Sequence, residues 1–318
     1  IDIDGDGIMS GGIDMEIEIE ALSGSDSGSF SANNFTVSYA DPPDIALPVS
    51  ATFEEEGPPV IVDATMEISD VDSGNLDGGS LDVDITTGGT VNDELLITET
   101  GGITVEEAEG DFYVLYNGTA IGVIDGSFNG SAGHLLVTFN TDSTPEAAEA
   151  LAQAVAFSNN KVIPDTTDRE ITFTIDDGDG GVATELVTVE LLLEGGLVRN
   201  DHNQGTDTDW FTAANWTQGV LPDATMVAII NGPAATTFNS GSANETVAKL
   251  LLNNDLDVTA GTLNVNSTSE VDAGSFLTIG GGTVQGTGSL NVKGAVDLTG
   301  GATLGMASVT IGADDAIG

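Results

Sequence analysis

The stretch Arg169-Glu170-Ile171-Thr172-Phe173-Thr174-Ile175-Asp176-Asp177-Gly178-Asp179-Gly180 decides the fold of this chain. Its apolar residues alternate with polar ones, as on a β-strand with one buried face, and an Asp- and Gly-rich turn ends the run. The same pattern recurs between residues 45 and 194, which predicts an antiparallel β-sandwich of Greek-key type. The other strand signals are Val60 to Val62, Met66 to Ile68, Leu81 to Ile85, Leu95 to Ile97, Phe112 to Tyr116, Leu135 to Phe139 and Leu186 to Leu193.

One helix interrupts these strands. Residues Pro145 to Ala154 have proline near the start, acidic residues in the first turn and alanine throughout, which is typical of a short helix. Thr144 or Ser143 would cap it. The predicted fold class is therefore all-β with one short helix.

The charge of the chain restricts its partners. The 318 residues hold 52 acidic residues against 5 basic ones, a net charge of -47. Such a chain repels nucleic acids and anionic lipids, and it attracts cations, divalent ones above all. Hydrophobic residues make up 40% and alternate in β fashion, which argues against a disordered acidic tail. There is no cysteine, so disulfides and thiolate metal sites are excluded.

Charge also divides the chain into parts. Residues 1–194 hold 40 acidic and 2 basic residues, whereas residues 195–318 hold 12 and 3, so a boundary is predicted near Gly195-Gly196. A second break is expected at Asp41-Pro42-Pro43-Asp44, because proline cannot donate to a central sheet. We therefore predict the C-terminal part of a preceding β-module over 1–44, a β-sandwich over 45–194 and the start of a β-solenoid over 195–318.

The solenoid prediction rests on short apolar triplets that follow Gly-rich corners. Leu263-Asn264-Val265 recurs as Leu290-Asn291-Val292 after 27 residues, and Val271-Asp272 recurs as Val296-Asp297 after 25. A period near 25 without a helical stretch predicts stacked β-coils.

Two tryptophans precede these triplets. Trp210 and Trp216 are expected to cover the open apolar end of the first coil, since a bare end invites edge pairing. The alternative is a platform on which sugars stack.

The N-terminal residues suggest a calcium loop. Asp2, Asp4 and Asp6 put carboxylates at alternate positions, and Gly7 follows at the sixth, as an EF-hand loop begins. Because Ile13 stands at the twelfth position, this is not a standard EF-hand. Calcium binding and an acidic turn without metal both stay open.

Farther along, Asp70 and Asp72 flank Val71, so on a strand end both would point to one side.

The stretch from Thr52 to Leu193 resembles the cadherin-like modules that are repeated in large bacterial surface adhesins. The family's connector reads Asn-Asp-x-Pro, and here Ala40 replaces the asparagine. The matching phrases are Phe53 to Val60, Ile68 to Leu76, the helix running into Val155 to Asn159, and Arg169 to Gly180.

The resemblance implies a set of calcium ligands. They are a glutamate after the connector, the pair Asp70 and Asp72, and the loop carboxylates Asp177 and Asp179. Among Glu54, Glu55 and Glu56 we take Glu55 as that glutamate. The alternative is a solvated acidic surface without metal. Calcium at such positions would stiffen the junctions between modules.

The C-terminal part resembles the coil-forming segments of right-handed β-helix surface proteins of the autotransporter type. The resemblance is carried by Trp210-Phe211-Thr212-Ala213-Ala214-Asn215-Trp216 with Gly219 and Pro222.

Enzymatic activity has little support in the sequence. The two histidines, His134 and His202, accompany no nucleophile elbow, phosphate loop or zinc spacing, so we predict that the protein is not an enzyme. No apolar stretch approaches the ~20 residues of a membrane helix.

These observations predict a calcium-stabilised stalk or adhesin segment, extracellular or on a bacterial cell surface, and cut from a longer chain. Its expected partners are calcium ions, neighbouring modules or copies of itself, and surface glycans. The alternative is a self-assembling subunit of an extracellular filament, sheath or surface layer.

Overall fold

A computed structural model describes residues 42–45, 50–71, 73–203 and 207–312. These residues belong to one compact unit of the chain. The predicted calcium ligands Asp2, Asp4, Asp6 and Asp72 lie outside the described residues.

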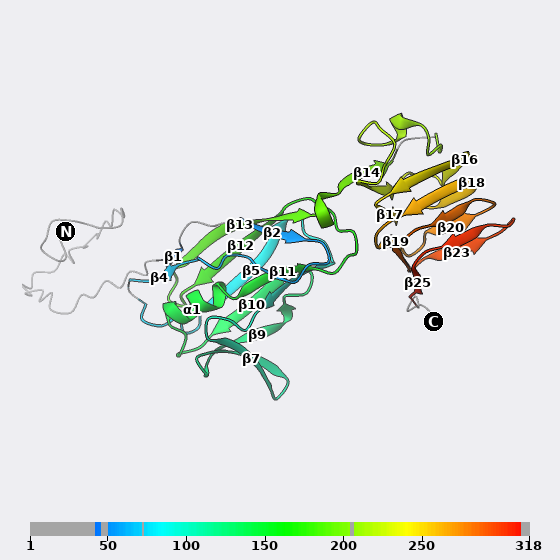
Figure 1. The fold of residues 1–318 in the computed structure, drawn as a ribbon. Helices are drawn as coiled ribbons and strands as arrows, with labels where there is room; N and C mark the ends of the chain where they lie inside the picture. The colour runs from blue at the N-terminus through cyan, green and yellow to red at the C-terminus, as the bar shows by residue number, and fades with distance from the viewer. Residues whose placement is uncertain (1–41, 46–49, 72, 204–206, 313–318) are drawn as a thin grey trace, which may run out of the picture. The chain divides into compact units, whose positions relative to one another are not determined.

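The first part of the unit is a β-sandwich, as predicted (Figure 1). An eight-stranded sheet has the order β2-β13-β12-β5-β10-β9-β8-β7, a three-stranded sheet has the order β3-β11-β6, and β1 pairs with β4. The strands are β1 (Asp44–Ile45), β2 (Ala51–Glu54), β3 (Val60–Ile61), β4 (Ile68–Ser69), β5 (Ser80–Thr87), β6 (Asp93–Ile97), β7 (Ile103–Ala108), β8 (Asp111–Tyr116), β9 (Thr119–Asn129), β10 (His134–Phe139), β11 (Val155–Asn159), β12 (Arg169–Asp176) and β13 (Val182–Leu192).

The alternation in β12 explains the sandwich core. Ile171, Phe173 and Ile175 are fully buried, and the residues between them are half-buried. Phe53 of β2 meets Phe157 of β11 edge to face, with ring centroids 5.4 Å apart, so the two sheets interlock through aromatic side chains.

Helix α1 (Pro145–Ala152) packs at one end of the sandwich (Figure 1). The Thr144 side chain accepts a hydrogen bond from Ala147 N, which confirms one of the two expected caps. Glu149 Oε2 accepts from Ile68 N, and Gln153 Nε2 donates to Met66 O. The helix is therefore tied to β4 and the residues before it by side-chain bonds as well as by buried alanines.

The sequence pattern missed strand β9, the longest in its hairpin region. Gly122 and Gly126 interrupt its apolar alternation, which hides the strand from a period-two search. A Cβ at Gly122 would lie 2.6 Å from the carbonyl oxygen of Thr138 on β10. Glycine is needed there because the two strand backbones approach so closely.

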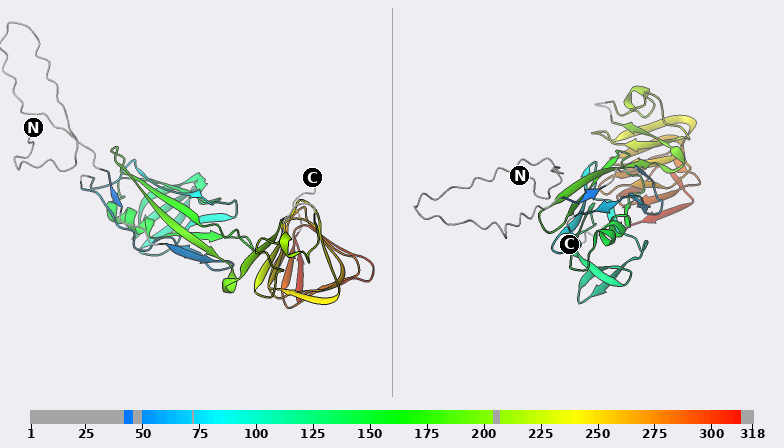
Figure 2. Two further views of the ribbon diagram at one scale, coloured as in Figure 1. Left: turned by 90° about the horizontal axis from the view of Figure 1, so that it is seen from above. Right: turned by 90° about the vertical axis from the view of Figure 1, so that its left-hand side faces the viewer.

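The second part is a β-solenoid of about four turns, also as predicted, and the left view of Figure 2 shows its coils. All of its named strands pair in parallel, in two six-stranded sheets. One sheet contains β14 (Val198–His202), β15 (Met226–Ile230), β17 (Lys249–Leu252), β19 (Ser269–Val271), β22 (Ser289–Val292) and β25 (Ser308–Ile311). The other contains β16 (Thr236–Val247), β18 (Leu256–Val265), β20 (Phe276–Ile279), β21 (Thr283–Gln285), β23 (Ala295–Leu298) and β24 (Thr303–Gly305).

The predicted period near 25 is wrong. Leu263 pairs with Val284, 21 residues on, and Leu290 pairs with Ser269 instead of Leu263. Likewise Val271 and Val296 lie in different sheets. The repeated triplets therefore belong to different sheets of the solenoid. They look alike because every strand that faces the core needs the same alternation of apolar and polar residues.

Candidate functional site

The two tryptophans belong to the solenoid core. Trp210 and Trp216 are 1% and 2% exposed, their rings meet at 4.7 Å, and Trp216 Nε1 donates to Trp210 O at 2.7 Å. Trp210 also packs on Phe238. Buried rings of this kind close the first coils and leave no face for sugar stacking, so the capping interpretation is the one that fits.

The predicted ligand Asp177 organises the turn between β12 and β13. Its Oδ1 accepts hydrogen bonds from the backbone nitrogens of Asp179, Gly180 and Gly181, at 2.7, 2.9 and 3.0 Å. The side chain is 1% exposed, whereas Asp179 lies exposed beside it. One carboxylate oxygen therefore holds the loop, and the other is left for a different partner.

The loop that begins at Asp70 abuts the Asp177 turn. Asp70 Oδ1 accepts from Ser73 N, and the loop ends at β5, whose Ser80 lies opposite Asp176. A Cβ at Gly178, where φ is +84°, would lie 2.2 Å from the carbonyl oxygen of Asp77. The two acidic loops thus lie backbone against backbone at one end of the sandwich.

Asp177 Oδ2 and Ser143 Oγ are buried in this region, and neither has a hydrogen-bond partner among the described residues. Ser143 lies in the segment before α1, and its carbonyl accepts from Leu76 N of the Asp70 loop at 2.7 Å. A buried carboxylate oxygen without a donor is costly, and a bound cation is one way to satisfy it.

A complete metal centre is not assembled by the described side chains. Within residues 42–45, 50–71, 73–203 and 207–312, no three His, Asp or Glu side chains converge on a point where they could hold an ion. Asp72 lies outside that set. Calcium also accepts carbonyl, hydroxyl and water oxygens, so the donor chemistry around Asp177 suits that ion.

Glu55 does not join the other predicted ligands. β2 pairs in parallel with the C-terminal end of β13, and Glu55 N donates to Leu192 O. Asp177 precedes the other end of β13, which is 11 residues long. At ~3.3 Å per residue, Glu55 lies roughly 30 Å from the Asp177 turn. The structure therefore divides the predicted ligand set between the two ends of the sandwich.

The partner of Glu55 is Lys249, the first residue of β17 in the solenoid. The Lys249 ammonium contacts Glu55 Oε1 directly and lies 3.2 Å from Glu194 Oε2. The side chains of Lys249 and Glu55 are both fully buried. Burial lowers the pKa of Lys249 to about 8, so the side chain still carries its charge at neutral pH.

Apolar side chains surround this ion pair. Val227 and Ile229 of β15 and Leu251 of β17 are buried against Ile163 and Leu193 of the sandwich. In β17 the residues Leu250 and Leu252 point into the solenoid core, so Lys249 and Leu251 point outward. The signal for this contact was a lone lysine at the head of Leu250-Leu251-Leu252.

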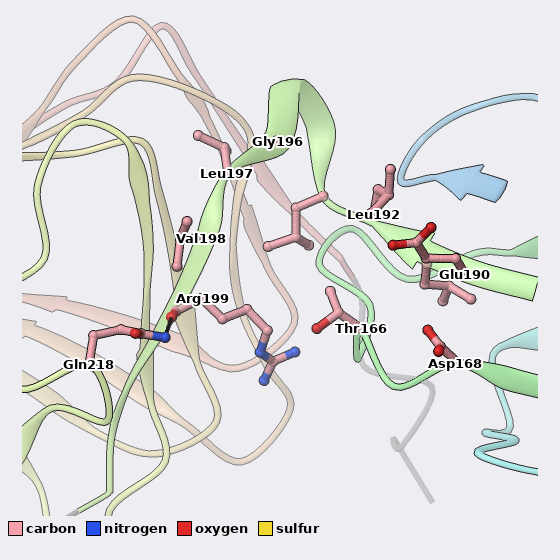
Figure 3. A pocket seen from close by; sticks show the side chains of 11 residues that line it. Thr166, Asp168, Glu190, Leu192, Gly196, Leu197, Val198, Arg199 and Gln218 are labelled. Atoms are coloured by element: carbon pink, nitrogen blue, oxygen red, sulfur yellow. Dashed lines mark hydrogen bonds between the residues drawn. The ribbon is translucent and has the colours of Figure 1, made fainter.

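A cleft of about 430 Å³ opens beside the same junction (Figure 3). Thr166, Asp168 and Glu190 line one side of the view, and Arg199 and Gln218 line the other. Arg199 is already engaged, because its Nη1 donates to Pro164 O at 3.0 Å. Sequence reasoning could not find this cleft, since its walls come from segments far apart along the chain.

Both histidines are engaged in structural contacts. His134 Nε2 lies 2.9 Å from Asp82 Oδ1, and its ring packs against Phe128. His202 is buried, with Nδ1 3.1 Å from Thr236 Oγ1. Neither ring lies among the residues that line the cleft.

The described residues contain no helix of the length and apolarity that a membrane span requires.

Comparison with family models, with curated proteins and with solved structures found no match to this chain.

Proposed function

We propose that the chain is a calcium-stabilised stalk segment of an extracellular adhesin, with a cadherin-like sandwich followed by a β-solenoid. The observation that carries the proposal is Asp177 Oδ2, a buried carboxylate oxygen without a hydrogen-bond donor among the described residues. With 52 acidic residues against 5 basic ones, the chain has few cations of its own for such oxygens. An external divalent cation supplies the missing charge.

The ion would be held at the sandwich end where the two acidic loops abut. Asp177 contributes Oδ2, and Asp70 and Asp179 lie in the same pair of loops. When bound, calcium would neutralise these carboxylates and join the two loops.

An extracellular location suits this chemistry. Calcium sites of modest affinity fill only where calcium is abundant, outside the cell. A chain without cysteine that binds such ions gains rigidity without disulfides. Rigidity is what a stalk needs to hold a binding tip away from the cell.

The test is thermal unfolding of the natural chain and of two variants, each in calcium and in chelator. In both variants the changed aspartate accepts a hydrogen bond from a backbone nitrogen of its own turn. Asp177→Asn keeps an oxygen for the loop amides and replaces the free oxygen with an amide. Asp223→Asn is the control, because Asp223 Oδ1 also holds a turn, through Thr225, but the side chain is exposed. We expect calcium to raise the Tm of the natural chain and of Asp223→Asn, and to have a smaller effect on Asp177→Asn. An equal Tm in calcium and chelator for the natural chain would exclude the proposal.

A second candidate is a self-assembling subunit of a filament, sheath or surface layer. The observation in its favour is strand β7, which lies at the outer edge of the eight-stranded sheet and pairs with β8 on one side. An edge strand presents backbone groups that can pair with another chain. Electron microscopy at micromolar protein separates the two: single particles support the stalk, and ordered polymers support the subunit.

A further inference from the structure

Four glutamates lie at the junction between sandwich and solenoid, and one of them, Glu55, is buried while the other three are exposed. Glu55 is buried there, Glu194 reaches the same ammonium, and Glu54 Oε1 accepts from Gly195 N at 2.9 Å. Burial and the nearby charge of Glu194 raise the pKa of Glu56. Four acidic side chains thus meet where β2 ends and the chain leaves β13. Glu55 is the buried member of this group, so its charge needs a partner.

The chain supplies that partner itself. All five basic residues lie within the described residues, and each takes part in an ion pair. Lys249 differs from the other four because it contacts two carboxylates, one from β2's end and one from the connector after β13. Its ammonium therefore joins three segments that are distant in sequence.

Only the solenoid coils that meet the sandwich have an outward face that can surround a buried counter-charge. Leu251 of β17 pairs with Glu270 of β19, which pairs with Asn291 of β22. The outward row is apolar at Ile229 and Leu251 and becomes polar in the later coils. Lys249 is the one charged residue on the apolar portion, so it occupies the place where the buried Glu55 needs a counter-charge.

We propose that Lys249 is a built-in counter-cation that locks the sandwich to the solenoid, in the role that calcium would have beside Glu55. This junction then stays rigid without calcium, whereas the Asp177 end of the sandwich depends on it. The inference extends the calcium hypothesis and is tested separately from it.

The experiment measures the distribution of distances across the junction by pulsed electron paramagnetic resonance. The chain has no cysteine, so spin labels on Thr52→Cys, at the junction end of the sandwich, and Thr287→Cys, both exposed positions, are unique. Each protein is measured in calcium and in chelator. Lys249→Met removes the ammonium. Lys161→Met is the control, because Lys161 also joins the two parts, through Asp272 at 3.3 Å, but both of those side chains are 25% exposed.

We expect a narrow distribution for the natural chain and for Lys161→Met in both solutions. The distance distribution of Lys249→Met should be broad in chelator and narrow in calcium, because the carboxylates freed from Lys249 then bind the calcium ion. Broadening of the natural chain in chelator would overturn the proposal. So would a Lys249→Met distribution that stays narrow in chelator, or one that calcium fails to narrow.

A double variant, Glu55→Gln with Lys249→Met, keeps the test decisive if Lys249→Met alone fails to fold. If Lys249→Met unfolds in chelator, recovery of its circular dichroism in calcium supports the proposal, provided that the double variant shows no calcium response at the junction. An equal response of the double variant would contradict it. Failure of the Asp177→Asn test alone leaves these expectations unchanged, so the two proposals fail independently.

Discussion

Arg169 and Asp93 form a fully buried ion pair in the sandwich, with Arg169 Nε donating to Asp93 Oδ2 at 2.9 Å. Asp93 Oδ1 also accepts from Asn159 Nδ2 at 2.6 Å, and Thr90 N donates to Oδ2. One carboxylate therefore joins β6, β11 and β12. Because both charges are out of water, each depends on the other.

Asp93→Asn is expected to destabilise the sandwich strongly. The substitution leaves the Arg169 guanidinium buried without its counter-charge, which costs ~3–5 kcal/mol of unfolding free energy. The measurement is urea denaturation followed by far-ultraviolet circular dichroism. Lys161→Met, which breaks a partly exposed pair, should cost only ~0–1 kcal/mol. Equal losses for the two variants would show that burial of the Arg169 pair has no special weight.

Trp216→Ala is expected to destabilise the solenoid. The substitution removes a buried ring that contacts Trp210 and His202, and such losses cost ~3–5 kcal/mol. Phe276→Ala is the control, since Phe276 is 50% exposed and should cost ~1 kcal/mol or less. Denaturation curves for both variants provide the comparison. A cost for Trp216→Ala no greater than the control would mean that the ring does not support the coils.

Glu270→Gln is expected to stabilise the protein at neutral pH. Burial, followed by a hydrogen bond with Asp272, raises the pKa of Glu270 above its ordinary 4.5, against the opposing effect of Lys293. A raised pKa favours the neutral carboxyl in the folded state. That contribution is full below pH 4.5 and is lost as the pH rises through the folded pKa.

The check is the Tm of both proteins between pH 4 and pH 8, where the ordinary carboxyl pKa of 4.5 divides the range. Glutamine stays neutral throughout, so its advantage should grow with pH and vanish near the acidic limit. An advantage that is constant with pH would indicate a packing effect instead. A loss at neutral pH would indicate that the Lys293 ion pair outweighs burial.

Much of the local structure was readable from the sequence. Ile171, Phe173 and Ile175 predicted a strand with one buried face, and Pro145 with its alanines predicted α1, because both patterns depend on neighbours a few residues away. The tryptophan cap followed from the need to cover a coil end. Of the candidate calcium ligands, Asp70, Asp177 and Asp179 were placed by their loops at one end of the sandwich.

Tertiary structure alone decided the coil register and the partner of Glu55. The triplets at Leu263 and Leu290 look alike, yet they belong to different sheets, since stacking depends on the length of each corner as well as on the strand. Glu55 and Lys249 are 194 residues apart, and no local pattern links them. Their contact exists because β2 and β17 are brought to one junction, where an apolar surround makes each charge require the other.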